Sequence, residues 1–197
     1  AINPGNDYKE IAEQHPDWFQ VNREGKSLIE EKAYVDYYKF LTPALPEVRD
    51  YLIGTFERAV RDWGFDGLKL DFIDEFALSG EDPAIREDFA GRDIRGIPEA
   101  VDRLMKDVLS RLKKINPDVL VEFRQHYMGP AILQYGNMMR CADCPADPCA
   151  NRRRVCDLRL TSDGIAVHSD MLVWSPEDSV ADAVRVILNA IFSTVQY

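Results

Sequence analysis

Short apolar segments alternate with longer amphipathic segments along most of this chain of 197 residues. The apolar segments are typical of buried strands, and the amphipathic segments are typical of helices that cover a sheet. Strands are predicted near residues 34–41, 67–70, 119–123, 138–142 and 164–168, and another begins near 194. Helices are predicted over 46–63, 98–116 and 150–160, and from 175 onward. This alternation predicts an α/β fold in which a parallel sheet is covered by outer helices.

Local signals mark the helix boundaries. Pro46 stands where the first long helix begins, and Gly64 is suited to end it in a left-handed conformation. Ser175 and Pro176 open a segment with the pattern of a capping box, so a helix is predicted to begin there. The apolar stripes of the first two long helices predict their buried faces. They comprise Val48, Leu52, Phe56, Ala59 and Trp63, and then Val101, Leu104, Val108, Leu112 and Ile115.

The number of strand–helix units limits the architecture. A closed barrel of eight units takes about 250 residues, so residues 1–197 are predicted to form a single domain that is part of a (β/α)8 TIM-type barrel. The alternative is an open, doubly wound sheet, but neither of the glycine-rich phosphate-binding patterns follows any predicted strand. The chain starts without methionine and stops within a predicted strand, so we expect it to be an internal piece of a longer protein.

Composition excludes several classes of partner. A net charge of −10 argues against nucleic acid, whose phosphates would be repelled. No apolar run approaches the roughly 20 residues that span a bilayer, so no membrane partner is expected. The start of the chain lacks the layout of a signal peptide, and we expect a cytoplasmic protein. The exposed sheet edges of an incomplete barrel would favour association into a homo-oligomer.

Four cysteines lie close together in the sequence, at Cys141, Cys144, Cys149 and Cys156. Their spacing raises the hypothesis of a zinc or iron–sulfur site, with nearby carboxylates as supporting ligands. The alternative is a set of free thiols in a reducing compartment, or one incidental disulfide.

Acidic side chains follow successive predicted strands. Asp71 and Asp74 follow the strand at 67–70, Glu122 lies at the end of the next, and Asp143 and Asp147 follow the one after that. The carboxyl ends of parallel strands meet at one edge of a sheet, where active sites are built. Two carboxylates on opposite sides of a sugar are what glycoside hydrolysis requires.

The alternatives for these residues are structural. A single aspartate after a strand is more often a helix cap or a loop anchor than a catalyst. Lys69, two residues before Asp71, points to the same side of the strand and either holds Asp71 ionised or forms a plain ion pair. Arg140 could simply neutralise Asp143, and Asp170, which follows His168, could cap a turn.

Several stretches resemble glycoside hydrolase family 36, the α-galactosidases of the melibiase clan. They are HPDW at 15–18, LTP at 41–43 followed by PEVRDYL at 46–52, DWGFDGLKLDF at 62–72, and residues 140–152 with 166–170. The third stretch is the most specific, because the family's nucleophile ends a K-x-D motif. The resemblance implies a (β/α)8 barrel, of which this chain would hold about strands 3 to 8. It also implies a retaining mechanism on α-galactosides.

The resemblance assigns roles to individual residues. Asp71 matches the nucleophile, and Asp143 matches the acid/base in preference to Asp147. Substrate-binding roles are expected for Lys69, Asp74, Glu122, Arg124, Arg140 and Asp147. The family's acid/base motif has serine where this chain has Ala142, and many relatives have a cysteine- or glycine-containing motif where this chain has Glu122 to Arg124. Neither a metal nor another cofactor is implied.

The sequence therefore favours a retaining glycoside hydrolase with a carbohydrate substrate, most simply an α-galactosidase. Two other functions stay open. One is a metal-binding protein that uses the four cysteines, and the other is a sugar-binding relative without catalysis.

Overall fold

The computed structural model describes residues 9–21, 29–32, 35–71, 73, 91–124, 131–162, 164–173, 175–189 and 195–196. The chain forms two compact units. One unit holds residues 1–65 and 73–117, and the other holds residues 66–72 and 118–197. Whether both belong to one barrel domain stays a prediction.

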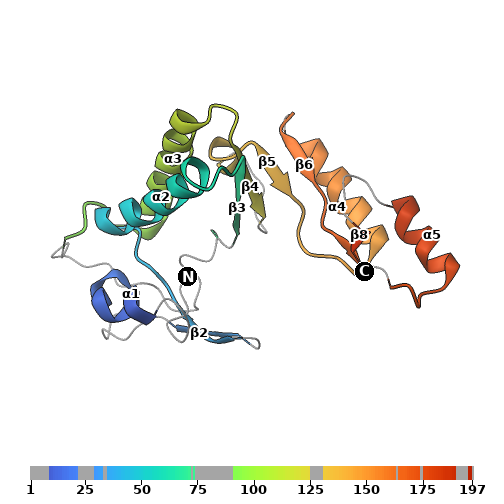
Figure 1. The fold of residues 1–197 in the computed structure, drawn as a ribbon, viewed down its shortest axis with the longest axis horizontal. Helices are drawn as coiled ribbons and strands as arrows, with labels where there is room; N and C mark the ends of the chain where they lie inside the picture. Colours follow the sequence, from blue (N-terminus) through green and yellow to red (C-terminus); the bar gives the residue numbers. More distant parts are fainter. Residues whose placement is uncertain are drawn as a thin grey trace. The chain divides into compact units, whose positions relative to one another are not determined.

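The first unit combines a small hairpin with helices. Its elements are α1 (Lys9–Gln14), the 3-10 helix η1 (Pro16–Trp18), β1 (Ile29–Lys32), β2 (Val35–Lys39), α2 (Pro46–Arg61) and α3 (Ile97–Ile115) (Figure 1). Strands β1 and β2 pair antiparallel in a sheet of their own. The expectation that the strand near 34–41 belongs to the parallel sheet is therefore wrong. Only two residues join β1 to β2, and parallel strands need a much longer crossover.

Helices α2 and α3 pack along one another (Figure 1). Val48, Leu104, Val108 and Leu112 are fully buried, as the 3.6-residue period predicts. Trp63 does not follow the prediction, because α2 ends at Arg61 and the indole is largely exposed.

Gly64 does end α2 as predicted. Its φ of 72° lies in the left-handed region, which favours glycine. The amide of Phe65 donates to the carbonyl of Ala59, which closes the last turn of the helix.

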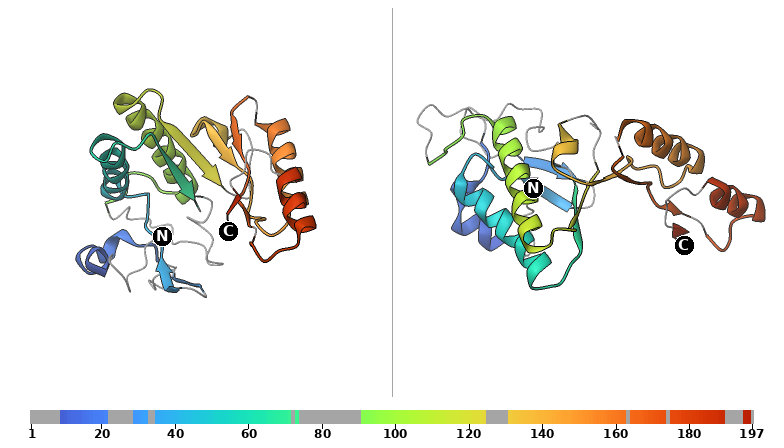
Figure 2. Two further views of the ribbon diagram at one scale, coloured as in Figure 1. Left: turned by 45° about the vertical axis from the view of Figure 1, so that its right-hand side comes forward. Right: turned by 90° about the horizontal axis from the view of Figure 1, so that it is seen from above.

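The second unit contains a parallel sheet of four strands in the order β3-β4-β5-β6 (Figure 2). The strands are β3 (Gly67–Asp71), β4 (Leu120–Arg124), β5 (Met138–Arg140) and β6 (Ala166–His168). The prediction of a mixed α/β protein with a parallel sheet is thus confirmed, and closure of that sheet into a barrel stays a prediction. Gly67 allows β3 to start close against β4, because a Cβ there would lie 2.5 Å from the carbonyl oxygen of Leu120.

The second unit also contains η3 (Ile132–Gln134), α4 (Pro148–Thr161), β7 (Leu172–Val173), α5 (Val180–Asn189) and β8 (Val195–Gln196). Strands β7 and β8 form a separate parallel pair. Helices α4 and α5 lie side by side, and Arg152 on α4 donates to the carbonyl of Leu188 on α5 (Figures 1 and 2).

The predicted start of the last helix, at Ser175, is wrong. Residues 175–178 form a turn in which the amide of Ser175 is bound by the carboxylate of Asp178. Helix α5 begins at Val180, where the hydroxyl of Ser179 accepts from the amide of Asp182. Within the described parts of the chain, no helix is long and apolar enough to cross a bilayer.

Candidate active site

The two faces of the four-stranded sheet differ sharply in chemistry. Residues on one face are apolar and buried, namely Leu70, Val121, Phe123 and Met139. The other face carries the charged and titratable residues Lys69, Asp71, Glu122, Arg124, Arg140 and His168, together with Leu120, Met138 and Ala166. In a parallel sheet, paired residues project to the same side, and Asp71, Arg124, Arg140 and His168 are paired in succession across the four strands. The sheet therefore presents one polar face, and its last row lies at the carboxyl ends of the strands.

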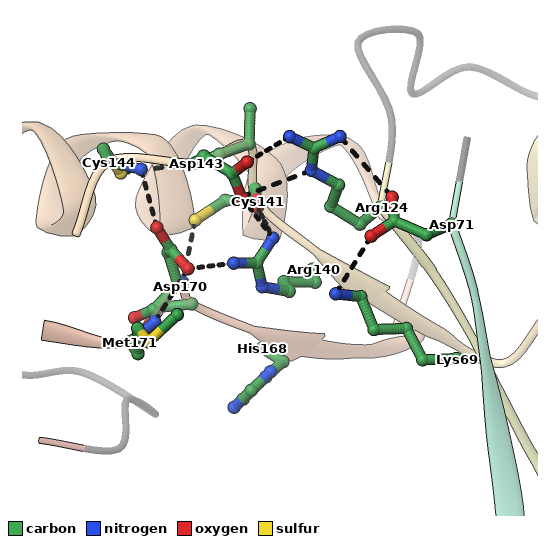
Figure 3. A network of polar contacts seen from close by, with 12 residues as sticks. Lys69, Asp71, Arg124, Arg140, Cys141, Asp143, Cys144, His168, Asp170 and Met171 are labelled. Atoms are coloured by element: carbon green, nitrogen blue, oxygen red, sulfur yellow. Dashed lines mark hydrogen bonds and ion pairs between the residues drawn. The ribbon is translucent and has the colours of Figure 1, made fainter. Parts of the chain in front are cut away.

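Asp71 ends β3 and is held by two cations. Lys69 Nζ lies 3.2 Å from Asp71 Oδ2, and Arg124 Nη1 lies 3.4 Å from Asp71 Oδ1 (Figure 3). The carboxylate is therefore flanked by two positively charged side chains, one from its own strand and one from β4. Asp71 also remains partly exposed, so a ligand on the polar face can reach it. These are the properties that a carboxylate nucleophile needs.

Asp143 lies in the segment after β5 and is held by two arginines of neighbouring strands. Arg140 Nη1 donates to Asp143 Oδ1 at 2.9 Å, and Arg124 Nε donates to the same oxygen at 3.3 Å. Arg124 Nη2 also contacts Asp143 Oδ2. Arg124 thus lies between Asp71 and Asp143, so one guanidinium connects the two candidate catalytic carboxylates (Figure 3).

The electrostatic surroundings of Asp143 favour its ionised form. Burial by itself would raise the pKa of Asp143, but hydrogen bonds and charges from Arg140 and Arg124 outweigh burial and lower the pKa below its ordinary value. A general acid needs the opposite shift, because it must carry a proton at the working pH. In this arrangement Asp143 is therefore equipped as a base and not as an acid.

Asp170 extends the same network and fixes the segment that carries Asp143. Its carboxylate pairs with Arg140 Nη2 and accepts hydrogen bonds from the amides of Cys144, at 2.6 Å, and Met171, at 2.9 Å. Asn151 of α4 donates to the carbonyl of Asp170. Asp170 is fully buried, so its role is that of an anchor for the 141–147 segment and not that of a group open to substrate.

The structure does not bring all of the other predicted site residues next to Asp71 and Asp143. Asp147 caps α4, because its carboxylate accepts from the amide of Ala150 at 2.9 Å. Glu122 is mostly buried, and its Oε2 lies 3.5 Å from Nδ1 of His168. Asp74 lies outside the described residues. Lys69, Arg124 and Arg140 gather around the two candidate catalytic carboxylates, and their substrate-binding roles stay a prediction.

The four cysteines are free thiols, and they differ in exposure. Cys141 is buried, Cys144 is half-buried, and Cys149 and Cys156 are exposed on α4. Among the residues that the structure describes, no three histidine, cysteine or acidic side chains are arranged to hold a metal ion. The metal hypothesis gains no support from this arrangement.

Two residues of the network were not among the predicted site residues. Asp170, two residues after β6, was considered only as a possible turn cap, because its burial and its pairing with Arg140 depend on the neighbouring strand. Asn151 had no signal beyond its presence inside a helix, where asparagine is unfavourable unless its amide is used.

Comparison with known proteins finds similarity at the level of the fold alone. No protein-family model matches the chain, and no curated protein does. Solved structures do match. The α-galactosidase TtGalA from Thermus thermophilus, in complex with stachyose, has a TM-score of 0.60 and 18% identity over 95% of this chain and 40% of its own. An α-galactosidase from Lactobacillus brevis has a TM-score of 0.60 and 17% identity over 98% of this chain and 26% of its own.

A third structure is the glycoside hydrolase domain of PelA from Pseudomonas aeruginosa. It has a TM-score of 0.56 and 18% identity over 96% of this chain and 72% of its own. Identities this low show a shared fold and nothing finer. The chain spans less than half the length of the Thermus thermophilus structure.

Proposed function

We propose that this chain belongs to a retaining glycoside hydrolase that cleaves terminal α-galactosides. The observation that carries the proposal is the position of Asp71, which ends β3 on the polar face and is held by Lys69 and Arg124. The K-x-D motif that ends at Asp71 and the α-galactosidases among the similar structures support the choice of substrate.

In the first step, an oxygen of Asp71 attacks the anomeric carbon while the bond to the leaving oxygen breaks, which gives a glycosyl-enzyme. Asp143 supplies the proton that the leaving oxygen takes up. In the second step, Asp143 takes a proton from water, and the water oxygen replaces Asp71 on the anomeric carbon. The lowered pKa of Asp143 suits this second step as it stands, whereas the first step requires a proton on Asp143.

Lys69 and Arg124 have two tasks in this mechanism. They orient the Asp71 carboxylate for the attack, and they offer N–H donors to sugar hydroxyls next to it. Arg140 holds Asp143 and, through Asp170, the segment that carries it. These roles for Lys69, Arg124 and Arg140 belong to the proposal.

The test is hydrolysis of a panel of aryl α- and β-glycosides by the full-length protein and by Asp71→Asn. We expect the α-galactoside to be hydrolysed with retention, seen by NMR of the first-formed anomer. Asp71→Asn should lower kcat/KM by about 10³-fold or more, which corresponds to roughly 4 kcal/mol of barrier.

The matched control is Asp66→Asn, an exposed carboxylate just before the amino end of β3. Its turnover should equal that of the unmodified protein. Turnover that survives Asp71→Asn would refute the nucleophile, and release of the inverted anomer would refute the mechanism. If a different α-glycoside is hydrolysed with the same dependence on Asp71, the substrate assignment would change and the proposed mechanism would still be supported.

A second candidate function is sugar binding without catalysis. It is favoured by the two arginines that keep Asp143 ionised, because such a carboxylate does not protonate a leaving group. Binding of D-galactose without turnover of any glycoside in the panel would select this function.

A further inference from the structure

Asp143 and its two arginines differ greatly in exposure. The side chain of Asp143 is 57% exposed, whereas those of Arg124 and Arg140 are 10% and 8% exposed. An exposed carboxylate exchanges an ion pair for water at little cost. A mostly buried guanidinium is strongly destabilised when its counter-charge is removed. The arginines are therefore the fixed part of this contact, and Asp143 is the exchangeable part.

Asp143 meets Arg124 and Arg140 from its exposed side. When Asp143 leaves, an anionic group can take its place between the two arginines from that side.

The geometry of the vacated position suits a carboxylate. Arg124 and Arg140 are paired residues of β4 and β5, so their guanidinium groups stand next to each other on the same face. Asp143 uses both of its oxygens there, one toward Arg140 and both toward Arg124. Paired N–H donors on arginine match the two oxygens of a carboxylate, so a ligand carboxylate can make the same contacts.

We propose that the substrate is an acidic α-glycoside, whose sugar carboxylate replaces Asp143 between Arg124 and Arg140 and releases Asp143 to act as the proton donor. The substrate class rests on the proposed glycoside hydrolase function. Once released, Asp143 takes a proton from solvent and gives it to the leaving oxygen, while Asp71 forms the bond to the anomeric carbon. The exchange favours the first step, because the groups that lower the pKa of Asp143 then hold the substrate and the raising effect of burial is no longer opposed.

The binding test uses D-galacturonate and D-galactose, which differ in the carboxylate, on the full-length protein carrying Asp71→Asn. We expect galacturonate to bind at least tenfold more tightly by titration calorimetry. Adding Asp143→Asn should increase the affinity for galacturonate further, because the charged Asp143 carboxylate no longer competes for the two arginines. The affinity for galactose should change by less than twofold. The matched control is Asp157→Asn, an exposed carboxylate on α4, which should change neither affinity.

A second readout follows the proton. At acidic pH, near the ordinary pKa of an aspartate, galacturonate binding should be accompanied by proton uptake, seen as a dependence of the binding enthalpy on the ionisation enthalpy of the buffer. This uptake should vanish in Asp143→Asn. Arg124→Lys keeps a charge but loses the paired donors, and it should weaken galacturonate about tenfold more than galactose.

The kinetic test compares aryl α-galacturonide with aryl α-galactoside, and we expect at least a tenfold higher kcat/KM for the galacturonide. Equal affinities for the two sugars, or weaker galacturonate binding in Asp143→Asn, would overturn the exchange. Efficient galactoside turnover without preference for the acid would overturn the exchange and keep the proposed function. If galacturonate binds more tightly in Asp143→Asn but no glycoside is hydrolysed, the acidic ligand would be supported and the proposed hydrolase function would be refuted.

Discussion

Arg140 and Asp170 form an ion pair in which both side chains are almost completely buried. Arg140 is the last residue of β5, and Asp170 lies two residues after the end of β6. The carboxylate of Asp170 also accepts a hydrogen bond from the amide of Cys144, in the segment that carries Asp143. If one member of such a buried ion pair is removed, the other remains as an uncompensated charge in a poorly solvated position.

Removal of the Asp170 carboxylate should therefore be severe. We expect Asp170→Ala to lower the free energy of unfolding by about 3–5 kcal/mol, because Arg140 is left without its buried counter-charge. Urea unfolding followed by circular dichroism measures the change. Asp170→Asn keeps the acceptor for the amides and should lose less. A loss below about 1 kcal/mol for Asp170→Ala would contradict the anchoring role.

Asp147 should behave as a helix cap. Because its carboxylate accepts from the amide of Ala150 at the start of α4, Asp147→Ala should lower the free energy of unfolding by about 1 kcal/mol. Asp147→Asn preserves the acceptor and should lose less than half as much in the same thermal or urea unfolding measurement. Equal losses for the two variants would show that the charge matters and the cap does not.

Asp93 should make the stability of the first unit depend on pH. The hydrogen bond from the buried Arg49 is the main cause that lowers the pKa of Asp93 in the folded protein. A carboxyl whose folded pKa is below its unfolded pKa stabilises the fold above the unfolded value, and this contribution is lost as the pH falls through the folded value.

We expect the unmodified protein to exceed Asp93→Asn in unfolding free energy by about 1 kcal/mol at pH 7, a value reduced by the partial exposure of the carboxylate. The difference should shrink as the pH falls below about 4. Urea unfolding from pH 7 to pH 3 measures it. A difference that stays constant over this range would rule out the titration of Asp93 as its source.

Gly67 and Gly54 should respond in opposite directions to alanine. A Cβ at Gly67 would lie 2.5 Å from the carbonyl oxygen of Leu120, so Gly67→Ala must push β3 away from β4 and should cost about 1–3 kcal/mol. Gly54 lies within α2, and a Cβ added there would meet no atom within 4 Å, so Gly54→Ala should stabilise by up to about 1 kcal/mol. Urea unfolding of both variants measures the two changes. Similar effects at both positions would contradict the close start of β3.

The cysteines should differ in reactivity. Burial is the main cause that raises the pKa of Cys141 to about 11, so at pH 8 it carries roughly two orders of magnitude less thiolate than a thiol of ordinary pKa. We expect iodoacetamide to label the exposed Cys149 and Cys156 well before Cys141, as followed by peptide mass spectrometry. Protection of all four thiols that ends when a chelator is added would restore the metal hypothesis.

Local residue patterns were sufficient to locate most of the helices and the strand that carries Asp71. Apolar periodicity located α2 and α3 to within a few residues, because burial of one helix face imposes its period on the residue pattern. Strand β3 and its terminal Asp71 were equally clear, since an apolar run between a helix end and a carboxylate leaves few alternatives. The start of α5 could not be located from the sequence, because Ser175 and Ser179 can both accept a hydrogen bond from a following backbone amide. Which of the two serines precedes the helix depends on the conformation of the backbone.

How the charges combine could be seen only in the assembled sheet. In the sequence, the acidic residues after the strands suggested a site lined by carboxylates. The register of β3, β4 and β5 instead places Arg124 between Asp71 and Asp143, and Arg140 between Asp143 and Asp170. The charge state of a carboxylate depends on groups within a few ångströms, and those groups come from strands more than 50 residues away in the case of Asp71 and Arg124. No local pattern records that distance, so the pairing of these residues follows from the register of the strands and not from the order of residues along the chain.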